Sequence, residues 1–339
     1  TMNPLISEVN SYPFDRLRNL LGKSSPKKNK NDFINLSIGE PKQNSNKEIL
    51  KILKKNEKLF SQYPPIESIR ELTDSYKTYL NKRFGVSNIE NENILNLGGT
   101  REGTFSVIQS LFNRSLKSKK PFIFMPNPFY QIYGGASLFA GAISKHINLN
   151  EEKDFILDLD SVSENQWQKC QILIMCSPSN PTGSVMKREE ILKVIKLSRK
   201  YNFYIVSDEC YIDIYRKKPP ESFIQVSIEK YGNMKNIVSL HSLSKRSNLP
   251  GFRSGMICGD KKLINNFKKY RAFHGVSIPL PIQMASSAAW KDEKTVFKNR
   301  DFYKENFELA KKILNYDAPE GAFYTVSYTH LRAHETALD

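Results

Sequence analysis

A lysine in the second half of the chain is surrounded by residues that suit one kind of chemistry. Lys245 follows Ser242 and Ser244, and Arg253 lies eight positions after it. An amine of this kind can hold a carbonyl cofactor as a Schiff base, while hydroxyl groups and a guanidinium hold a phosphate. A solvated basic loop in a lysine-rich protein would have similar residues, so the rest of the chain must decide between the two interpretations.

Two further polar residues follow apolar segments that are typical of strands. Asp208 ends the segment 204–207, and Tyr211 comes three residues later. A carboxylate there could keep a pyridine nitrogen protonated, so that the ring accepts electrons, or it could simply cap a helix. Asn180 lies in the proline-rich turn 177–183, where it could donate a hydrogen bond to a phenolic oxygen.

A glycine turn leads directly into a predicted helix. Its residues Gly99, Thr100 and Arg101 would place backbone N–H groups and the positive end of the helix dipole where a phosphate binds well. Tyr130 could stack on a flat ring, and Tyr63 stands on a rigid turn before two prolines. Each of these features also has an ordinary structural explanation, as a capped turn or a core aromatic.

Strands and helices alternate from about residue 94, and the candidate loops follow the strand ends. The predicted strands cover 94–97, 121–125, 142–149, 171–176, 203–207, 236–239 and 254–258. The helices predicted among and after them cover 101–116, 129–140, 187–200 and 261–272. Continuous apolar strands that alternate with helices predict a mainly parallel sheet covered on both faces. Ligands of such sheets lie beyond the carboxyl ends of the strands.

The ends of the chain have a different pattern. A helix over 14–21, a strand over 32–38 and helices over 47–60 and 68–84 come before the alternating region. The helical pattern over 281–314 is too long for one globular helix, and we expect it to bend.

The composition excludes several classes of protein. A chain of 339 residues with 39% hydrophobic residues predicts one large and one smaller domain. The net charge is +16, but the lysines are scattered, so we expect no nucleic-acid binding. Four cysteines without a CxxC pair predict buried reduced thiols and no zinc. No segment is typical of a signal peptide or a membrane span, which favours a cytoplasmic protein without membrane contact.

Taken in order along the chain, these residues resemble the fold-type-I pyridoxal-phosphate aminotransferases of class I/II. More specifically, the chain is similar to the bacterial succinyldiaminopimelate aminotransferases. The similarity lies in the segments 12–18, 36–42, 127–133, 207–211, 248–255 and 270–275, and it covers about residues 2 to 324.

The resemblance implies a role for each residue around the cofactor ring. Lys245 would form the Schiff base with pyridoxal 5'-phosphate and then move the proton between substrate and cofactor. Asp208 would pair with the pyridine nitrogen, and Asn180 and Tyr211 would bond the ring hydroxyl. Tyr130 would stack on the ring.

The resemblance also implies a phosphate site and two further contacts. The phosphate would be held by Gly99, Thr100, Arg101, Ser242, Ser244 and Arg253. Tyr63 would reach the phosphate of the neighbouring subunit, which implies a homodimer, and Gly39 would lie near the substrate carboxylate.

The expected fold class is α/β. A mostly parallel mixed sheet is sandwiched by helices, as in the major domain of pyridoxal-phosphate transferases, and an incomplete small α+β domain accompanies it. Residues 1–44 would form an N-terminal arm and part of the small domain, and residues 45–284 the large cofactor-binding domain. Residues 285–324 would begin the C-terminal small domain, and residues 325–339 would be a non-native tail.

The tail prediction rests on a loss of pattern. After Tyr324 the resemblance ends, where the family continues with strands and an arginine that clamps the substrate carboxylate. We therefore expect a truncated gene with a foreign tail, in which Arg332 is not that clamp. Such a chain would bind the cofactor weakly and transaminate poorly.

The predicted function of the intact parent is transamination between an amino acid and 2-oxoglutarate or glutamate. The specific prediction is N-succinyl-LL-2,6-diaminopimelate aminotransferase in lysine biosynthesis. An aspartate- or aromatic-type aminotransferase and a C–S β-lyase remain open alternatives on the same scaffold. A non-catalytic aminotransferase-like binding domain is the alternative from another class, and the N-terminus is too short for the DNA-binding module that usually accompanies it.

Overall fold

The computed structural model describes residues 3–9, 13–22, 39–116, 119–150 and 155–325. The chain forms two compact units that divide after Glu40. The first contains the helices α1 (Leu5–Glu8) and α2 (Pro13–Leu21), and α2 confirms the helix predicted over 14–21. The predicted strand over 32–38 lies outside the described residues, and the four predicted domain ranges stay predictions.

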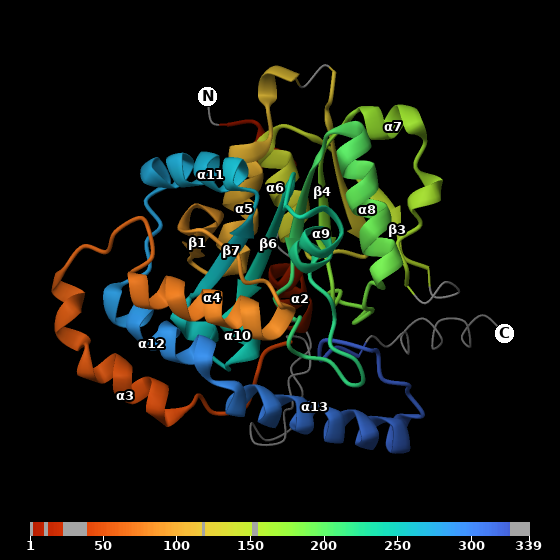
Figure 1. Cartoon of the computed structure of the whole chain (residues 1–339). Coiled ribbons are helices and arrows are strands. Elements are labelled where there is room, and N and C mark those ends of the chain that lie inside the picture. Colours follow the sequence, from red (N-terminus) through yellow and green to blue (C-terminus); the bar gives the residue numbers. More distant parts are fainter. Residues whose placement is uncertain (1–2, 10–12, 23–38, 117–118, 151–154, 326–339) are drawn as a thin grey trace. The chain divides into compact units, whose positions relative to one another are not determined.

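A mixed sheet of seven strands forms the centre of the second unit (Figure 1). The strand order is β1-β7-β6-β5-β4-β2-β3. Strand β7 runs antiparallel to both of its neighbours, and the other neighbouring pairs are parallel. This arrangement confirms the mostly parallel mixed sheet. The strands are β1 (Ile94–Leu97), β2 (Phe122–Asn127), β3 (Ile143–Asn148), β4 (Cys170–Cys176), β5 (Tyr204–Asp208), β6 (Ile237–Ser242) and β7 (Gly255–Gly259).

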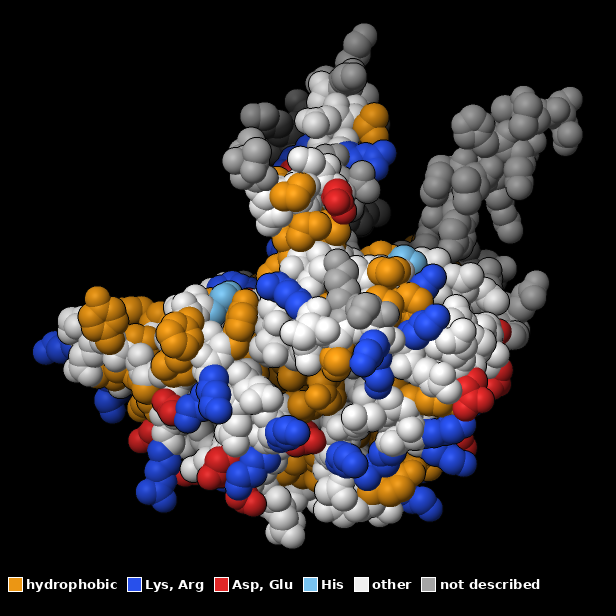
Figure 2. All heavy atoms as spheres, turned by 90° about the horizontal axis from the view of Figure 1, so that it is seen from above, with side chains coloured by type: hydrophobic (Ala, Val, Ile, Leu, Met, Phe, Trp, Pro, Cys, Tyr) orange, Lys and Arg blue, Asp and Glu red, His pale blue; other side chains and the backbone are white. Residues whose placement is uncertain are grey.

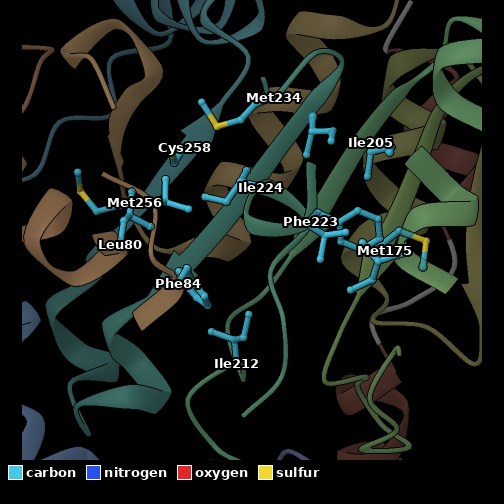
Figure 3. Packing of buried hydrophobic residues seen from close by; sticks show 14 of the residues in the cluster. Leu80, Phe84, Met175, Ile205, Ile212, Phe223, Ile224, Met234, Met256 and Cys258 are labelled. Carbon is cyan, nitrogen blue, oxygen red and sulfur yellow. The ribbon is translucent and has the colours of Figure 1, made fainter. Parts of the chain in front are cut away.

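The central strands are apolar throughout because both of their faces are buried. Every residue of β4 is buried. Leu173 and Met175 belong to one hydrophobic cluster, while Ile172 and Ile174 belong to the cluster on the opposite face. Figure 3 shows Met175 beside residues of the first cluster. Each such aliphatic side chain contributes about 1.5–3 kcal/mol when it is fully buried.

Helices cover both faces of the sheet, as predicted. Helices α4 (Arg70–Phe84), α8 (Arg188–Tyr201), α9 (Phe223–Tyr231) and α12 (Leu280–Lys291) contribute to the first cluster. Helices α5 (Thr100–Leu111), α6 (Ile132–Ala140) and α11 (Lys261–His274) contribute to the second. Helix α4 ends at Gly85, whose φ of 69° is the left-handed conformation that glycine adopts readily.

Several element boundaries differ from the sequence prediction. The predicted helix over 47–60 stops at Lys55, because α3 (Lys47–Lys55) gives way to the 3-10 turn η2 (Glu57–Ser61). Helix α5 likewise ends at Leu111, before the short turn η4 (Arg114–Leu116). Elements that we did not predict are α1, α7 (Glu164–Gln168), α9, α10 (Leu243–Arg246) and the 3-10 turns η3 (Asn91–Asn93), η6 (Leu159–Ser161) and η7 (Pro250–Phe252).

The long helical pattern over 281–314 breaks into two helices, as expected. Helix α12 ends at Lys291, and α13 (Glu293–Leu314) begins after Asp292. The Asp292 carboxylate accepts a hydrogen bond from the backbone N–H of Thr295 at 3.1 Å, so it caps the new helix. After α13, the described residues 315–325 make one antiparallel bridge, between Tyr215 and Gly321.

The structure shows where the basic side chains and the cysteines lie. On the face drawn in Figure 2, Lys and Arg side chains are scattered among acidic and apolar ones. Cys170, Cys176 and Cys258 are buried free thiols, whereas Cys210 is partly exposed. In the described part of the chain, no helix has both the length and the apolarity that crossing a bilayer requires.

Candidate active site

The predicted catalytic residues lie at the carboxyl ends of two neighbouring strands. Asp208 is the last residue of β5, and its register partner on β6 is Leu240. Strand β6 ends at Ser242, and the short helix α10 that follows contains Lys245. The sheet therefore brings Asp208 and Lys245 to the edge at which parallel sheets bind ligands.

The amine of Lys245 faces an aromatic wall. Its Nζ lies 5.9 Å from the ring centroid of Tyr211 and 5.3 Å from that of Phe323. The hydroxyl groups of Tyr211 and Tyr324 share a hydrogen bond, and Phe323 packs edge-on against Tyr211 at 5.5 Å between ring centroids. Phe323 and Tyr324 were missed as site residues, because in the sequence they only mark the end of the family resemblance.

Asp208 is a buried carboxylate with two donors. Its side chain accepts hydrogen bonds from the Tyr133 hydroxyl at 3.0 Å and from the Cys210 backbone N–H at 3.3 Å. Burial raises the pKa of Asp208, and these hydrogen bonds oppose the rise. Tyr133 was missed as well. It packs edge-on against Tyr130 at 5.7 Å between ring centroids, so the spacing Tyr130-x-x-Tyr133 was the signal available.

The loop with Asn180 lies beside this carboxylate. It follows β4, whose last residue, Cys176, is the register partner of Asp208. Within the loop, the backbone N–H of Gly183 donates to the carbonyl of Ser179 at 2.9 Å. The backbone N–H of Gly321 donates to the Gly183 carbonyl at 2.9 Å, so the segment before Phe323 is fixed to this loop.

The predicted phosphate residues meet around one glycine of β7. Gly255 pairs with Ser242 on one side and with Leu97 on the other, so the β6–α10 turn and the glycine turn before α5 are neighbours. The Ser242 hydroxyl accepts a hydrogen bond from the backbone N–H of Ser244 at 3.1 Å. The first N–H groups of α5 after Gly99 have no acceptor within the helix, which makes this end suited to an anion.

Arg253 completes this cradle. Its guanidinium donates to the carbonyl of Pro250 at 2.9 Å and to that of Gly98 at 3.4 Å, while the side chain stays exposed. A methyl group on Gly99 would overlap the guanidinium, so the two residues are in close contact. Thr100, the first residue of α5, is buried beside them.

The structure does not test the roles predicted for three further residues. Arg101 is exposed on α5, and the Tyr63 side chain is 100% exposed. Gly39 belongs to the first unit. The roles of these three residues stay predictions.

Replacing Gly99 with alanine is expected to weaken anion binding. The φ of 86° and ψ of 159° at Gly99 lie in a region that only glycine occupies readily, and the new methyl group would displace Arg253. We expect a loss of about 1–3 kcal/mol of stability and a rise of about tenfold or more in the dissociation constant for pyridoxal phosphate. Gly232→Ala is the matched control, since Gly232 also has a positive φ but open space around it. Equal dissociation constants for the two variants in a fluorescence titration would contradict the prediction.

Comparison with known proteins identifies the family to which the chain belongs. A family model described as "Aminotransferase class I and II" matches residues 31–337. The chain belongs to this family. LL-diaminopimelate aminotransferase of Aquifex aeolicus is 30% identical over 292 residues, which cover 84% of this chain and 72% of that protein.

Solved aminotransferase structures match most of the chain. An aminotransferase from Neisseria meningitidis is 37% identical with a TM-score of 0.88, and the match covers 95% of this chain and 82% of that one. Aminotransferase AspB from Helicobacter pylori is 36% identical with a TM-score of 0.86, over 93% and 82% of the two chains. These similarities confirm the predicted family and fold class.

The family match also bears on the predicted tail. It continues to residue 337, past Tyr324, where we placed the end of the resemblance. Residues 326–339 lie outside the described residues, so the foreign tail and the status of Arg332 are not confirmed.

Pyridoxal 5'-phosphate is the cofactor of this aminotransferase family, as predicted. The described residues fit it at three places. The cradle of Gly99 and Arg253 suits a phosphate, and Lys245 offers an amine beside an aromatic wall. The raised pKa of Asp208 marks a buried carboxylate that a protonated ring nitrogen would stabilise.

Removing the Tyr133 hydroxyl is expected to change how stability depends on pH. The folded-state pKa of Asp208 is already raised by burial, and Tyr133→Phe removes the hydrogen bond that opposes this rise. A raised carboxyl pKa contributes stability at low pH that is lost as the pH rises through the folded-state value. On going from acidic to neutral pH, the free energy of unfolding of the cofactor-free variant should therefore fall by about 1.5–3 kcal/mol more than that of the parent. The reason is that the ionised Asp208 has lost a hydrogen bond.

Urea unfolding at several pH values measures this difference. In an Asp208→Asn background the effect of Tyr133→Phe on the pH dependence should disappear, because no charge remains to be stabilised. A pH dependence that stays unchanged by Tyr133→Phe in the parent background would show that the hydroxyl does not act on Asp208.

Proposed function

We propose that this aminotransferase acts on N-succinyl-LL-2,6-diaminopimelate with 2-oxoglutarate as amino acceptor, in lysine biosynthesis. The observation that carries the reaction class is the joint placement of Lys245, Asp208 and the phosphate cradle at one edge of the sheet. The succinylated donor is proposed from the sequence resemblance to succinyldiaminopimelate aminotransferases. Relatives named LL-diaminopimelate aminotransferase support a diaminopimelate substrate. The relative named aspartate aminotransferase from Pyrococcus horikoshii, 28% identical over 307 residues, supports a second candidate, aspartate.

The proposed roles follow from the positions of the side chains. When bound, the cofactor supplies an aldehyde carbon and a ring that accepts electrons. Lys245 would bind at that carbon and, once displaced by the substrate amine, would move a proton between substrate and cofactor. Asp208, held by Tyr133 and the Cys210 N–H, would keep a proton on the ring nitrogen opposite. Tyr211 and Asn180 would orient the ring hydroxyl, and the cradle would fix the phosphate.

A comparison of amino donors tests the substrate. The chain is saturated with pyridoxal phosphate, and glutamate formation from 2-oxoglutarate is followed with N-succinyl-LL-diaminopimelate, LL-diaminopimelate and aspartate. We expect the succinylated donor to have the highest kcat/KM, by about tenfold or more. A preference for free LL-diaminopimelate or aspartate would overturn the substrate while keeping the reaction class. Release of pyruvate and a thiol from cystathionine would instead support the β-lyase.

We also propose that the chain works as a cytoplasmic homodimer. Tyr63 is fully exposed on the surface of one subunit, which is compatible with a contact to the site of a second copy. Sedimentation velocity of the cofactor-saturated chain measures the mass. A monomer in which Tyr63→Phe leaves the affinity for the cofactor unchanged would contradict the proposal.

A further inference from the structure

The residue after the candidate lysine points away from the site into a buried corner. Lys245 and Arg246 are consecutive residues of α10, a helix of four residues. The Lys245 amine faces Tyr211 and Phe323, whereas the Arg246 guanidinium lies over the rings of Tyr79 and Trp290. Arg246 is only 3% exposed, and an arginine is rarely buried to this extent unless its guanidinium is paired.

Arg246 binds the corner at which α12 ends and α13 begins. Its Nη1 donates to the carbonyl oxygens of Ala289 at 3.1 Å and Asp292 at 3.3 Å. Its Nη2 donates to the carbonyl of Trp290 at 3.4 Å and to the Glu293 carboxylate at 2.7 Å. One guanidinium thus satisfies the last carbonyls of α12 and pairs with the first residue of α13.

The backbone of the same loop is bound by α13. The Asn299 side chain donates to the carbonyl of Arg246 at 3.1 Å. Asn299 and Asn248 also exchange hydrogen bonds at 2.8 and 3.0 Å between their side chains. Both asparagines are buried, so α13 fixes the chain immediately after Lys245 through groups that water cannot replace.

A second arginine shares the acidic partner of Arg246 in this corner. The Arg246 Nε lies 2.9 Å from an oxygen of the buried Asp213, and the Nε of Arg83 lies 2.9 Å from the other oxygen. Burial raises the pKa of Asp213, but Arg246 and Arg83 outweigh it and hold the pKa below its ordinary value. The carboxylates of Asp213 and Glu293 together compensate the positive charges of both guanidiniums.

We infer that Arg246 is a positioning residue for Lys245, which it holds by fixing α10 to the corner between α12 and α13. A helix of four residues cannot hold its own orientation, so contacts outside it must place the lysine amine. The inference rests on the proposed role of Lys245 as the amine that binds the cofactor. It implies that a displacement of α13 at this corner moves the lysine amine.

Arg246→Lys tests the inference on the full chain. Lysine keeps a positive charge opposite Asp213, but its three donors cannot reproduce the fork that reaches four oxygens. We expect the rate at which added pyridoxal phosphate forms the visible absorption band of the lysine adduct to fall by up to about 10²-fold, because the amine is misplaced. Glu293→Gln, at the partly exposed end of the corner, should give a smaller change in the same direction.

Arg83→Lys is the matched control. Arg83 shares Asp213 and donates to the carbonyls of Ile212 and Pro220, but among the described residues its hydrogen bonds do not reach α10. We expect this variant to lose stability in urea unfolding while its rate of adduct formation stays within about twofold of the parent. Equal rates in Arg246→Lys and Arg83→Lys would overturn the inference. An absorption band in the parent that persists in Lys245→Ala would instead overturn the proposed role of Lys245.

Discussion

Lys245→Ala is expected to abolish the covalent link to pyridoxal phosphate and to lower transamination by about 10⁴-fold or more. The Nζ of Lys245 is the amine that the structure places against Tyr211 and Phe323, beyond the strand ends. Alanine removes the amine that acts both as the nucleophile and as the group that moves the proton, so two roles are lost in one substitution. Borohydride reduction of the cofactor-saturated chain followed by peptide mass spectrometry should find the label on Lys245 in the parent and none in the variant.

The affinity for the cofactor separates this effect from misfolding. The cradle around Gly99 and Arg253 is unchanged in Lys245→Ala, so non-covalent binding of pyridoxal phosphate should persist, with the dissociation constant raised. Lys261→Ala, which removes an exposed lysine paired with Glu90, is the control for the loss of a lysine. A label on a different lysine in the parent would refute the assignment.

The sequence allowed the order of elements and the positions of several candidate site residues to be predicted, while the roles of these residues stay predictions. Continuous apolar segments such as 171–176 can be satisfied only in a sheet that is buried on both faces, and β4 is such a strand. Asp208 and Ser242 are the last residues of strands and Lys245 follows one of them, so the fold places them at one edge without further information. Local patterns are sufficient here because the chemistry lies directly after the strands.

Other parts of the site depend on pairings between distant segments. Tyr133 donates to Asp208 across 75 positions of sequence, and Arg246 donates to Glu293 across 47. Tyrosine and arginine are common in ordinary cores and surfaces, so their types alone do not predict such partners. Phe323 was likewise unrecognisable, since its proximity to Lys245 follows from the contact between Gly321 and the loop at Gly183.

Asp208→Asn is expected to separate activity from stability. The amide has no negative charge with which to keep a proton on the ring nitrogen, so we expect transamination to fall by about 10²–10³-fold, the usual loss when one stabilising group is removed. The fold should tolerate the change, because asparagine is nearly isosteric. Its oxygen can accept the Cys210 N–H, and its amide can donate to the Tyr133 hydroxyl.

The effect of Asp208→Asn on stability should depend on pH, and the raised pKa of Asp208 gives its sign. Burial raises the folded-state pKa of Asp208 above its unfolded value, so its contribution is favourable at low pH and is lost as the pH rises through the folded-state pKa. In the cofactor-free chain at neutral pH, the ionised carboxylate is therefore a net cost that the amide lacks. Asp208→Asn without cofactor should be at least as stable as the parent above that pKa, and about as stable as the parent at low pH, where the carboxyl group is protonated and neutral like the amide.

Adding the cofactor should make the parent more stable than Asp208→Asn at neutral pH. A ligand that binds only the folded state stabilises it in proportion to the logarithm of its affinity, and the parent binds pyridoxal phosphate through the charge of Asp208 as well as through the cradle. Urea unfolding at pH 5 to about 8, with and without pyridoxal phosphate, measures all four combinations. A parent that remains more stable than Asp208→Asn in both conditions at neutral pH would mean that the carboxylate is stabilised by the protein alone. Asp208 would then be a structural ion, and the pairing with the ring nitrogen would lose its physical basis.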